Sequence, residues 1–281
     1  MIRIITDSAA DFSADELRAN NLTAIPLQIV FGDDAYEDGV TLTPEIFWQR
    51  ITAGENPKTS QPTPDAFLSA FEEAKAAGDS VVCVLLSSGL SGTVQSATLA
   101  KTMADYDEIY IVDSKLAATA EKLLALRACQ LRDENKLSAA EIAAELERLS
   151  KRVRLYASLD TLDYLARGGR IPQAAATLGS LVQLKVLITL NEEGKVSMAG
   201  KGMGLHRASA SLLKLIQEHK IDESLPVMPL YTCEPTNINA FIKKLNQAGI
   251  ACAEEDANFV GATISTHAGP GAFGLVFVEA E

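Results

Sequence analysis

The chain alternates short β-branched runs with longer amphipathic stretches, and this alternation constrains the fold more than any other feature of the sequence. The apolar runs are IRIIT, AIPLQIVF, VVCVLL, EIYIV, RLYASL, LKVLITL, VSMAG, LPVMPLY and GLVFVEA. Between them, apolar residues recur every three or four positions over 91–104, 116–135 and 138–152. Because parallel strands need a crossover that is usually a helix, the pattern predicts an α/β fold with mainly parallel sheets.

The length of 281 residues allows one or two domains. A basic KRVR follows two long helical stretches, and a new strand begins directly after it. We therefore expect two α/β domains, residues 1–155 and 156–281. The segment 32–67 interrupts the alternation and is rich in proline, so it is expected to form turns and one helix that begins at Pro44.

Charge and composition exclude several classes of protein. A formal charge of −12 repels nucleic acid phosphates and anionic lipid headgroups. No apolar run reaches membrane-spanning length, and the N-terminus lacks the apolar region of a secretory signal. The four cysteines lie too far apart for a zinc or redox motif and are expected to be reduced and buried. A cytoplasmic protein without nucleic acid partners or membrane insertion is the expectation.

Polar segments follow three of the expected strands: TDSAAD, SSGLSGT and DSK. Ligands of parallel α/β sheets bind outside the carboxyl ends of the strands. SSGLSGT offers hydroxyls and the free N–H groups of a helix expected to begin near Ser91, which is a suitable site for an anion. The alternative is that Ser91 only caps that helix. Asp113 and Ser114 are likewise interpreted as helix caps.

Enzyme motifs fit these loops poorly. SSGLSGT has Thr93 where a P-loop requires lysine, and Gly92 directly follows Ser91, which is too close for a nucleophile elbow. HAGPGAFG contains the order G-x-G-x-x-G, but no helix can follow it before the chain ends, so dinucleotide binding is discarded. A serine hydrolase with Ser91 as nucleophile, His267 as base and Asp7 or Asp113 as orienting group remains an alternative.

Two further segments have more than one interpretation. Thr59, in KTSQPTPD, can belong to a loop with a capping hydroxyl. LDTLDYLARGGRI indicates a helix that ends with a glycine in the left-handed conformation, and Arg170 can cap that end or face a partner.

Seven segments together resemble one family, the DegV family of bacterial fatty-acid-binding proteins. They occur in the family's order from residue 2 to residue 278: IITDSAAD, KTSQPTPDAF, LLSSGLSGTVQSA, IVDSKLAA, LDTLDYLARGGRI, LKVLITLNEEGKV and ISTHAGPGAFGLVFV.

The resemblance implies a long-chain fatty acid in a pocket at or near the domain interface, with no covalently bound cofactor. It implies a binding subunit rather than an enzyme: a separate kinase uses ATP and Mg²⁺ to convert the presented acid to an acyl phosphate. The family's carboxylate-binding hydroxyls match Thr59 and Ser91, and its histidine matches His267. The expected ligand-binding residues are Thr59, Ser60, Ser88, Gly89, Ser91, Gly92, Thr93 and His267.

One departure from the family affects the partner side. The family commonly carries an Arg-Thr pair where this chain has Met203 and Gly204. Lys201 or Arg207 can replace that arginine, or the partner contact has changed, in which case a protein-interaction module with an unrelated pocket is the alternative. The expected partner-facing residues are Arg170, Lys201 and Arg207.

Overall fold

The computed structural model describes residues 1–176 and 183–281. The chain forms two compact units, Met1–Lys151 and Arg152–Glu281. The division falls shortly before the boundary at residues 155 and 156 that the sequence suggests.

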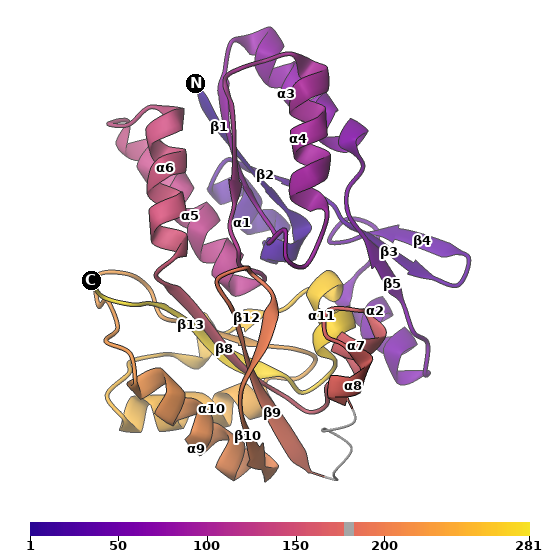
Figure 1. Ribbon diagram of the computed structural model, residues 1–281, viewed down its shortest axis with the longest axis vertical. Helices are drawn as coiled ribbons and strands as arrows, with labels where there is room; N and C mark the ends of the chain where they lie inside the picture. Colours follow the sequence, from indigo (N-terminus) through magenta and orange to yellow (C-terminus); the bar gives the residue numbers. More distant parts are fainter. Residues whose placement is uncertain (177–182) are drawn as a thin grey trace. The chain divides into compact units, whose positions relative to one another are not determined.

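The first unit contains a four-stranded parallel sheet (Figure 1). Its order is β2-β1-β6-β7, and every neighbouring pair is parallel. The strands are β1 (Ile2–Asp7), β2 (Leu22–Ile25), β6 (Ser80–Leu85) and β7 (Ile109–Asp113). The prediction of parallel α/β architecture is confirmed for this unit, and the carboxyl ends of β1, β6 and β7 carry the polar segments named above.

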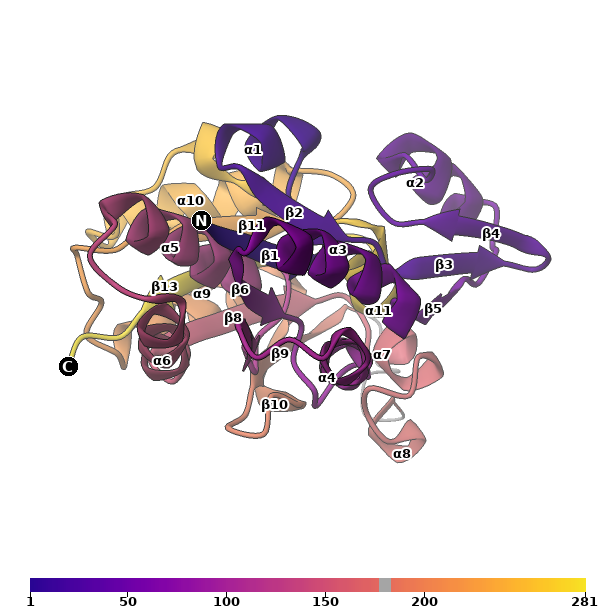
Figure 2. The same cartoon turned by 90° about the horizontal axis from the view of Figure 1, so that it is seen from above.

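Two pairs of helices cover this sheet, one pair on each face (Figures 1 and 2). One pair is α3 (Pro64–Ala77) and α4 (Thr93–Ala104), and the other is α5 (Thr119–Glu134) and α6 (Ala139–Ser150). The buried rings of Phe67 and Phe71 on α3 pack against Val81, Cys83 and Leu85 of β6. The small residues of α4 complete this core: Ala97, Ala100 and Ala104.

A small antiparallel sheet interrupts the alternation in the first unit. Its order is β4-β3-β5, with β3 (Gln28–Phe31), β4 (Asp34–Glu37) and β5 (Lys58–Ser60). Pro26 separates β2 from β3 inside the run AIPLQIVF, because proline cannot donate a ladder hydrogen bond. The expected helix at Pro44 is present as α2 (Pro44–Thr52), but β4 and β5 lie where only turns were expected. The unit also contains η1 (Ser8–Ala10) and α1 (Ala14–Ala19).

The second unit contains a six-stranded mixed sheet of order β10-β9-β8-β13-β11-β12. The strands are β8 (Val153–Leu159), β9 (Leu184–Leu190), β10 (Val196–Met203), β11 (Met228–Tyr231), β12 (Asn258–Phe259) and β13 (Phe273–Val278). The pair β11–β12 is parallel, whereas the other four pairs are antiparallel. The prediction of mainly parallel pairing is therefore wrong here. A tight turn at Gly194 joins β9 to β10, and β13 runs between β8 and β11 in the opposite direction.

Helices α9 (Gly204–Gln217) and α10 (Thr236–Gln247) pack together on one face of this sheet (Figure 1). Leu187 of β9 belongs to the core on this side, whereas its neighbour Val186 belongs to a second cluster with Leu162 and Leu165. The two residues alternate because successive side chains of a strand point to opposite faces. The described residues of this unit also form α7 (Asp163–Arg167), α8 (Gln173–Ala176), α11 (Ala262–Ala268) and η3 (Glu254–Asp256).

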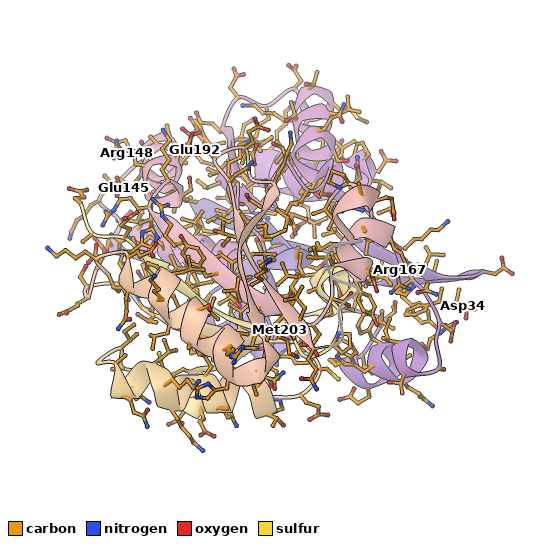
Figure 3. All side chains as sticks on the ribbon, turned by 60° about the horizontal axis from the view of Figure 1, so that its bottom comes forward. Asp34, Glu145, Arg148, Arg167, Glu192 and Met203 are labelled. Atoms are coloured by element: carbon orange, nitrogen blue, oxygen red, sulfur yellow. The ribbon has the colours of Figure 1, made fainter. Side chains whose placement is uncertain are left out.

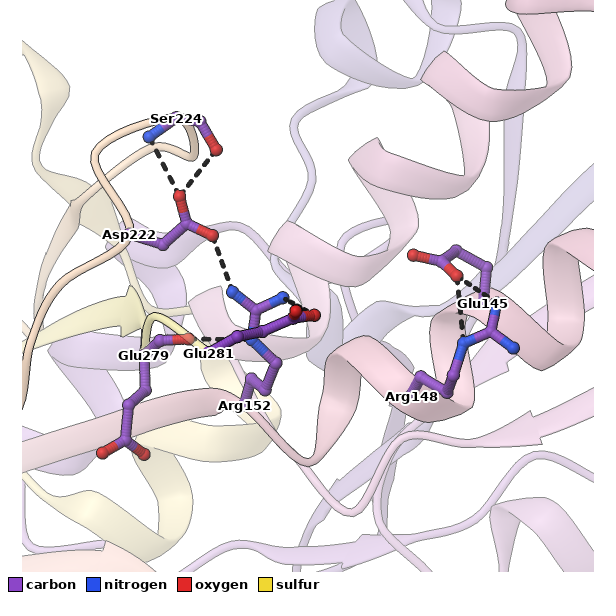
Figure 4. A network of polar contacts seen from close by, with 7 residues as sticks. All are labelled: Glu145, Arg148, Arg152, Asp222, Ser224, Glu279 and Glu281. Carbon is purple, nitrogen blue, oxygen red and sulfur yellow. Dashed lines mark hydrogen bonds and ion pairs between the residues drawn. The ribbon is translucent and has the colours of Figure 1, made fainter.

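Arg152, the first residue of the second unit, connects the start of β8 to the end of the chain (Figure 4). Its guanidinium donates to the backbone carbonyl of Glu279 over 2.8 Å and to the carboxylate of Asp222 over 2.6 Å. Asp222 also accepts from the backbone N–H and the hydroxyl of Ser224. The network holds the last strand, β13, beside β8.

Candidate functional site

Asp7, at the carboxyl end of β1, holds the beginning of the hydroxyl-rich loop. Its Oδ2 accepts the backbone N–H of Leu86 over 2.8 Å, and its Oδ1 accepts that of Ala9 over 2.9 Å. The side chain is fully buried. Burial raises the pKa of the Asp7 carboxyl from 3.8 to about 7, although the two backbone hydrogen bonds act in the opposite direction.

Ser87 organises the turn that follows. Its hydroxyl accepts the N–H of Gly89 over 3.1 Å, and its backbone carbonyl accepts the N–H groups of Leu90 and Ser91. Its own N–H donates to the carbonyl of Leu116 over 2.9 Å. Ser87 is completely buried and was not among the expected site residues. Its place as the first hydroxyl after an apolar strand was the only signal for this role in the sequence.

Helix α4 begins at Thr93, with Gly92 as its N-cap and without a hydrogen bond from a capping side chain. The hydroxyl of Ser91 instead pairs with that of Thr93 over 2.9 Å. The alternative in which Ser91 caps the helix is therefore wrong. A twelve-residue helix whose first N–H groups have no side-chain cap presents partial positive charge beside two hydroxyls.

Gln61 brings the segment of Thr59 to the start of α4. Its Nε2 donates to Ser96 Oγ over 2.9 Å, and its Oε1 would lie only 2.0 Å from a Cβ at Gly92. Thr59 lies in β5 opposite Ile29 and is half-buried, whereas Ser60 is exposed. The hydroxyls of Thr59, Ser91 and Thr93 thus come from two segments that Gln61 joins. Sequence reasoning did not assign this role to Gln61.

Lys115 neutralises the acid at the end of β7. Its ammonium lies 2.7 Å from Asp113 Oδ2 and donates to Ser88 Oγ over 2.8 Å. The N–H groups of Ser88 and Lys115 both reach Asp113 Oδ1. Burial opposes ionisation, but the hydrogen bonds from Lys115 and Ser88 outweigh it and lower the pKa of Asp113.

The interpretation of Asp113 and Ser114 as helix caps is wrong. α5 begins several residues later, at Thr119, with Ala118 as its N-cap, and the hydroxyl of Ser114 accepts the N–H of Leu116. Asp113 is therefore available to hold Ser88 and Lys115 in place.

His267 lies on α11 in the second unit and packs against Gly168. A Cβ at Gly168 would lie 2.1 Å from His267 Nδ1, so only glycine leaves room for this ring. Burial, followed by the nearby positive charge of Arg170, lowers the pKa of His267 to about 4. The imidazole is therefore neutral at pH 7 and can donate a hydrogen bond without carrying charge. Gly169 has a φ of 75°, which confirms the expected left-handed glycine after α7.

The glycine-rich HAGPGAFG segment forms the turn between α11 and β13. Gly269 ends α11 with a φ of 73°, and its carbonyl accepts the hydroxyl of Thr232 over 2.7 Å. The segment continues into the buried strand β13 and not into a helix. Rejection of dinucleotide binding is thus consistent with the local structure.

A groove of about 880 Å³ lies in the second unit between the β9–β10 hairpin and the start of α9. Leu184, Val186 and Met198 contribute apolar surface, and Lys201 and Arg207 contribute positive charge. No ion pair of either cation occurs with the described residues. Met203, labelled in Figure 3, also lines the groove and is 46% exposed. Met203 is therefore an apolar part of a groove that also carries two cationic side chains.

The hydroxyl and carboxylates required for the alternative hydrolase are committed to other contacts. Ser91 pairs with Thr93, Asp7 accepts two backbone N–H groups, and Asp113 binds Lys115. A triad instead requires the acid to orient a histidine that activates the serine. The hydrolase is the weaker interpretation.

Residues 1–176 and 183–281 contain no group of three or more metal-ligating side chains suited to an ion. They also contain no helix that is both long and apolar enough to cross a membrane. Cys83 and Cys129 are buried free thiols, whereas Cys233 and Cys252 are half-buried, so the expectation of burial holds for only two of the four.

Comparison with known proteins agrees with these local features. The family described as "Uncharacterised protein, DegV family" matches residues 1–280. The chain belongs to the DegV family. Protein DegV from Bacillus subtilis is 31% identical over 277 residues, which are 98% of each chain.

Solved DegV-family structures share the whole fold. The structure described as "Fatty Acid Binding of a DegV family Protein from Thermus thermophilus" superimposes with a TM-score of 0.86 at 32% identity, over 99% of both chains. A stearic-acid-binding protein from Eubacterium ventriosum gives a TM-score of 0.84 at 26% identity, over 99% of this chain and 98% of that one. The two-domain α/β fold is thus that of DegV proteins described as binding fatty acids.

Proposed function

We propose that this DegV-family protein binds a long-chain fatty acid and acts as a binding subunit, not as an enzyme. The observation that carries the proposal is the start of α4, which has no side-chain cap and lies beside the hydroxyls of Ser91 and Thr93. Gln61 holds the segment of Thr59 against it. The descriptions of the Thermus thermophilus and Eubacterium ventriosum structures as fatty-acid-binding support the same ligand class.

The head group is the part of the ligand that this arrangement suits. A carboxylate removed from water requires donors, or it becomes protonated. Hydroxyls and backbone N–H groups donate without adding a permanent charge, and the helix dipole favours the anion. In our proposal Thr59 and Ser91 donate to the carboxylate, with Ser60, Gly89, Gly92 and Thr93 around it. Ser88 is expected to contribute by holding Lys115. That His267 of the second unit also belongs to the ligand site is implied by the family resemblance and stays a prediction.

The alkyl tail supplies the main driving force for binding. An acyl chain with about fifteen buried methylenes gains roughly 12 kcal/mol at about 0.8 kcal/mol each. Association costs roughly 4 to 15 kcal/mol, so tight binding requires a tail that is almost completely enclosed. The pocket at or near the domain interface that the family resemblance implies stays a prediction.

The test of the head-group proposal is equilibrium titration with palmitate. Loss of one donor to a carboxylate costs about 1.5 to 3 kcal/mol, so Ser91→Ala and Thr59→Val should each weaken binding by about 10- to 100-fold. Thr98→Ala is the matched control, because that hydroxyl is exposed on α4 and donates to its own helix. Equal affinity of the wild type and both site variants would exclude this head-group site.

The second part of the proposal concerns the kinase that would use the bound acid. The cationic groove suits an acidic partner surface, so we propose that Lys201 and Arg207 face a fatty acid kinase, with Arg170 as a further contact. The double variant Lys201→Glu/Arg207→Glu should lower acyl phosphate formation by the kinase at least about tenfold, because reversed charges repel the same surface. Palmitate affinity should not change.

Lys243→Glu on α10 is the control for this charge reversal, because Lys243 is exposed and does not line the groove. An equal fall with both variants would indicate a general charge effect and would remove the groove from the proposal. An unchanged rate with the double variant would do the same.

A further inference from the structure

Beneath the hydroxyl-rich loop, two carboxyl groups are buried against each other. Asp7 of β1 and Glu121 of α5 are both 0% exposed and their carboxyl groups are neighbours, and Glu121 Oε2 accepts no hydrogen bond from a donor among the described residues. Two carboxyl groups can form a hydrogen bond only when at least one of them is protonated. Thr6 Oγ1 donates to Glu121 Oε1 over 3.2 Å, and Asp7 accepts the N–H of Leu86 over 2.8 Å. The pair thus connects α5 to the residue that begins the loop.

Within residues 1–176 and 183–281, no cationic side chain forms an ion pair with either carboxyl group. The negative charge of Asp11, which follows η1, raises the pKa of Glu121, and that of Asp38 raises the pKa of Asp7, so both neighbours disfavour additional negative charge. On β6, the thiol of Cys83 lies close enough to Asp7 for its pKa to be raised, after the larger effect of burial. Lys122, the next residue on α5, binds Glu16 at 2.6 Å instead. A proton is therefore the partner that the pair requires.

The start of α5 fixes Glu121 in this position. Ala118, the N-cap, has φ 53° and ψ −140°, which is a strained conformation for a residue with a Cβ. This residue leads directly into the first turn of α5, in which Glu121 is buried. The positive end of the helix favours a single negative charge on the pair but does not compensate two.

We infer that Asp7 and Glu121 are a positioning pair for the head-group loop, and that they hold Leu86 and the turn at Ser87 in place only while they share a proton. Loss of that proton leaves two adjacent buried carboxylates that repel each other, and the link between α5 and the loop opens. It also adds negative charge below the site proposed for an anion. This inference rests on the proposed function for its effect on the ligand, but not for its effect on the loop.

The pH range of the test follows from the two groups. Burial raises the pKa of Asp7 to about 7 and raises that of Glu121 well above its usual value. A carboxyl group with a raised pKa in the folded state stabilises that state fully below its unfolded pKa, and the effect is lost as the pH rises through the folded pKa. The Asp7 contribution therefore decreases between about pH 4 and pH 7, and the Glu121 contribution decreases at higher pH.

Hydrogen exchange at the Leu86 and Ser91 amides of the full chain, corrected for the intrinsic rate, tests the loop directly. Between pH 6 and pH 9 the equilibrium constant for the loop opening that exposes these amides should increase about tenfold or more in the wild type, as expected for one released proton. Glu121→Gln retains a donor to Asp7 that cannot ionise, so its increase should stay within about twofold. An equal rise in the wild type and in Glu121→Gln would overturn the inference.

Two further measurements keep the test decisive. Asp7→Asn replaces one backbone acceptor by a donor, so it should open the loop at every pH. Because Asp7→Asn can also impair folding, Thr6→Val serves as the milder second variant: the Thr6 hydroxyl lowers the pKa of Glu121, so its removal should shift loop opening to higher pH than in the wild type. Hexadecyl sulfonate, whose head group does not titrate in this range, should bind the wild type at least about tenfold more weakly at pH 9 than at pH 6, and Glu121→Gln equally at both.

The outcomes separate the two proposals. A loop that opens with pH in a protein that binds neither palmitate nor the sulfonate would contradict the fatty-acid site but not the pair. Sulfonate affinity that falls equally in the wild type and in Glu121→Gln would contradict the pair but not the site.

Discussion

Gly274→Val should unfold the second unit under conditions in which the wild type is stable. Gly274 lies in β13 opposite Ala157 of β8, and a Cβ there would lie 2.4 Å from the backbone oxygen of Tyr156 and 2.9 Å from Ala157 Cα. These are backbone atoms of the neighbouring strand, so relief requires β8 and β13 to separate. Overpacking of this kind costs about 3 kcal/mol, and the loss of strand pairing adds to it.

Urea denaturation combined with hydrogen exchange of β8 and β13 measures this effect. Gly200→Ala is the control in the same sheet, because the nearest atom to its Cβ would be Leu187 Cδ1, at 3.4 Å, which belongs to a side chain and not to the backbone. The control should change the free energy of unfolding by less than about 0.5 kcal/mol. A Gly274→Val protein with wild-type stability would contradict the close approach of β13 to β8 at Gly274.

Phe71→Ala should have a comparable effect on the first unit. The Phe71 ring is completely buried between α3 and β6, and its centroid lies 6.0 Å from that of Phe67. Truncation of a buried phenylalanine costs about 3 to 5 kcal/mol, because the transfer free energy is lost and a cavity remains. Hydrogen exchange of β1 and β6 should therefore become faster at low denaturant.

The control for this core substitution is Leu99→Ala on α4, because Leu99 is 51% exposed. Its cost should be below about 0.5 kcal/mol. If the two substitutions had equal effects, Phe71 could not be part of the main core of this unit.

Local sequence patterns predicted the strands of the first unit better than the pairing in the second. The runs at β6 and β7 are followed by helical periodicity, and the structure confirms the parallel pairing of β1, β6 and β7. In the second unit, β13 is the last element of the chain yet pairs with β8 and β11. Strand periodicity identifies such a segment but carries no information on its partners or direction, since these depend on contacts between distant residues.

The candidate site was predictable where its chemistry is local. Ser91 and Thr59 were identified from hydroxyl-rich segments that match the family, and the structure joins their segments through Gln61. Ser87, Lys115 and Glu121 were missed. Each acts through a residue far away in the sequence: Ser87 through Leu116, Lys115 through Ser88, and Glu121 through Asp7. Burial and proton sharing between such residues are properties of the folded chain.

The most direct test of the central claim is mass spectrometry of the organic extract of the protein purified from cells. The account predicts a long-chain fatty acid in an amount comparable to that of the protein, and an at least about tenfold lower amount from Ser91→Ala purified in the same way. Folded protein that yields no fatty acid, and that takes up none when palmitate is added, would contradict the assignment as a fatty-acid-binding protein.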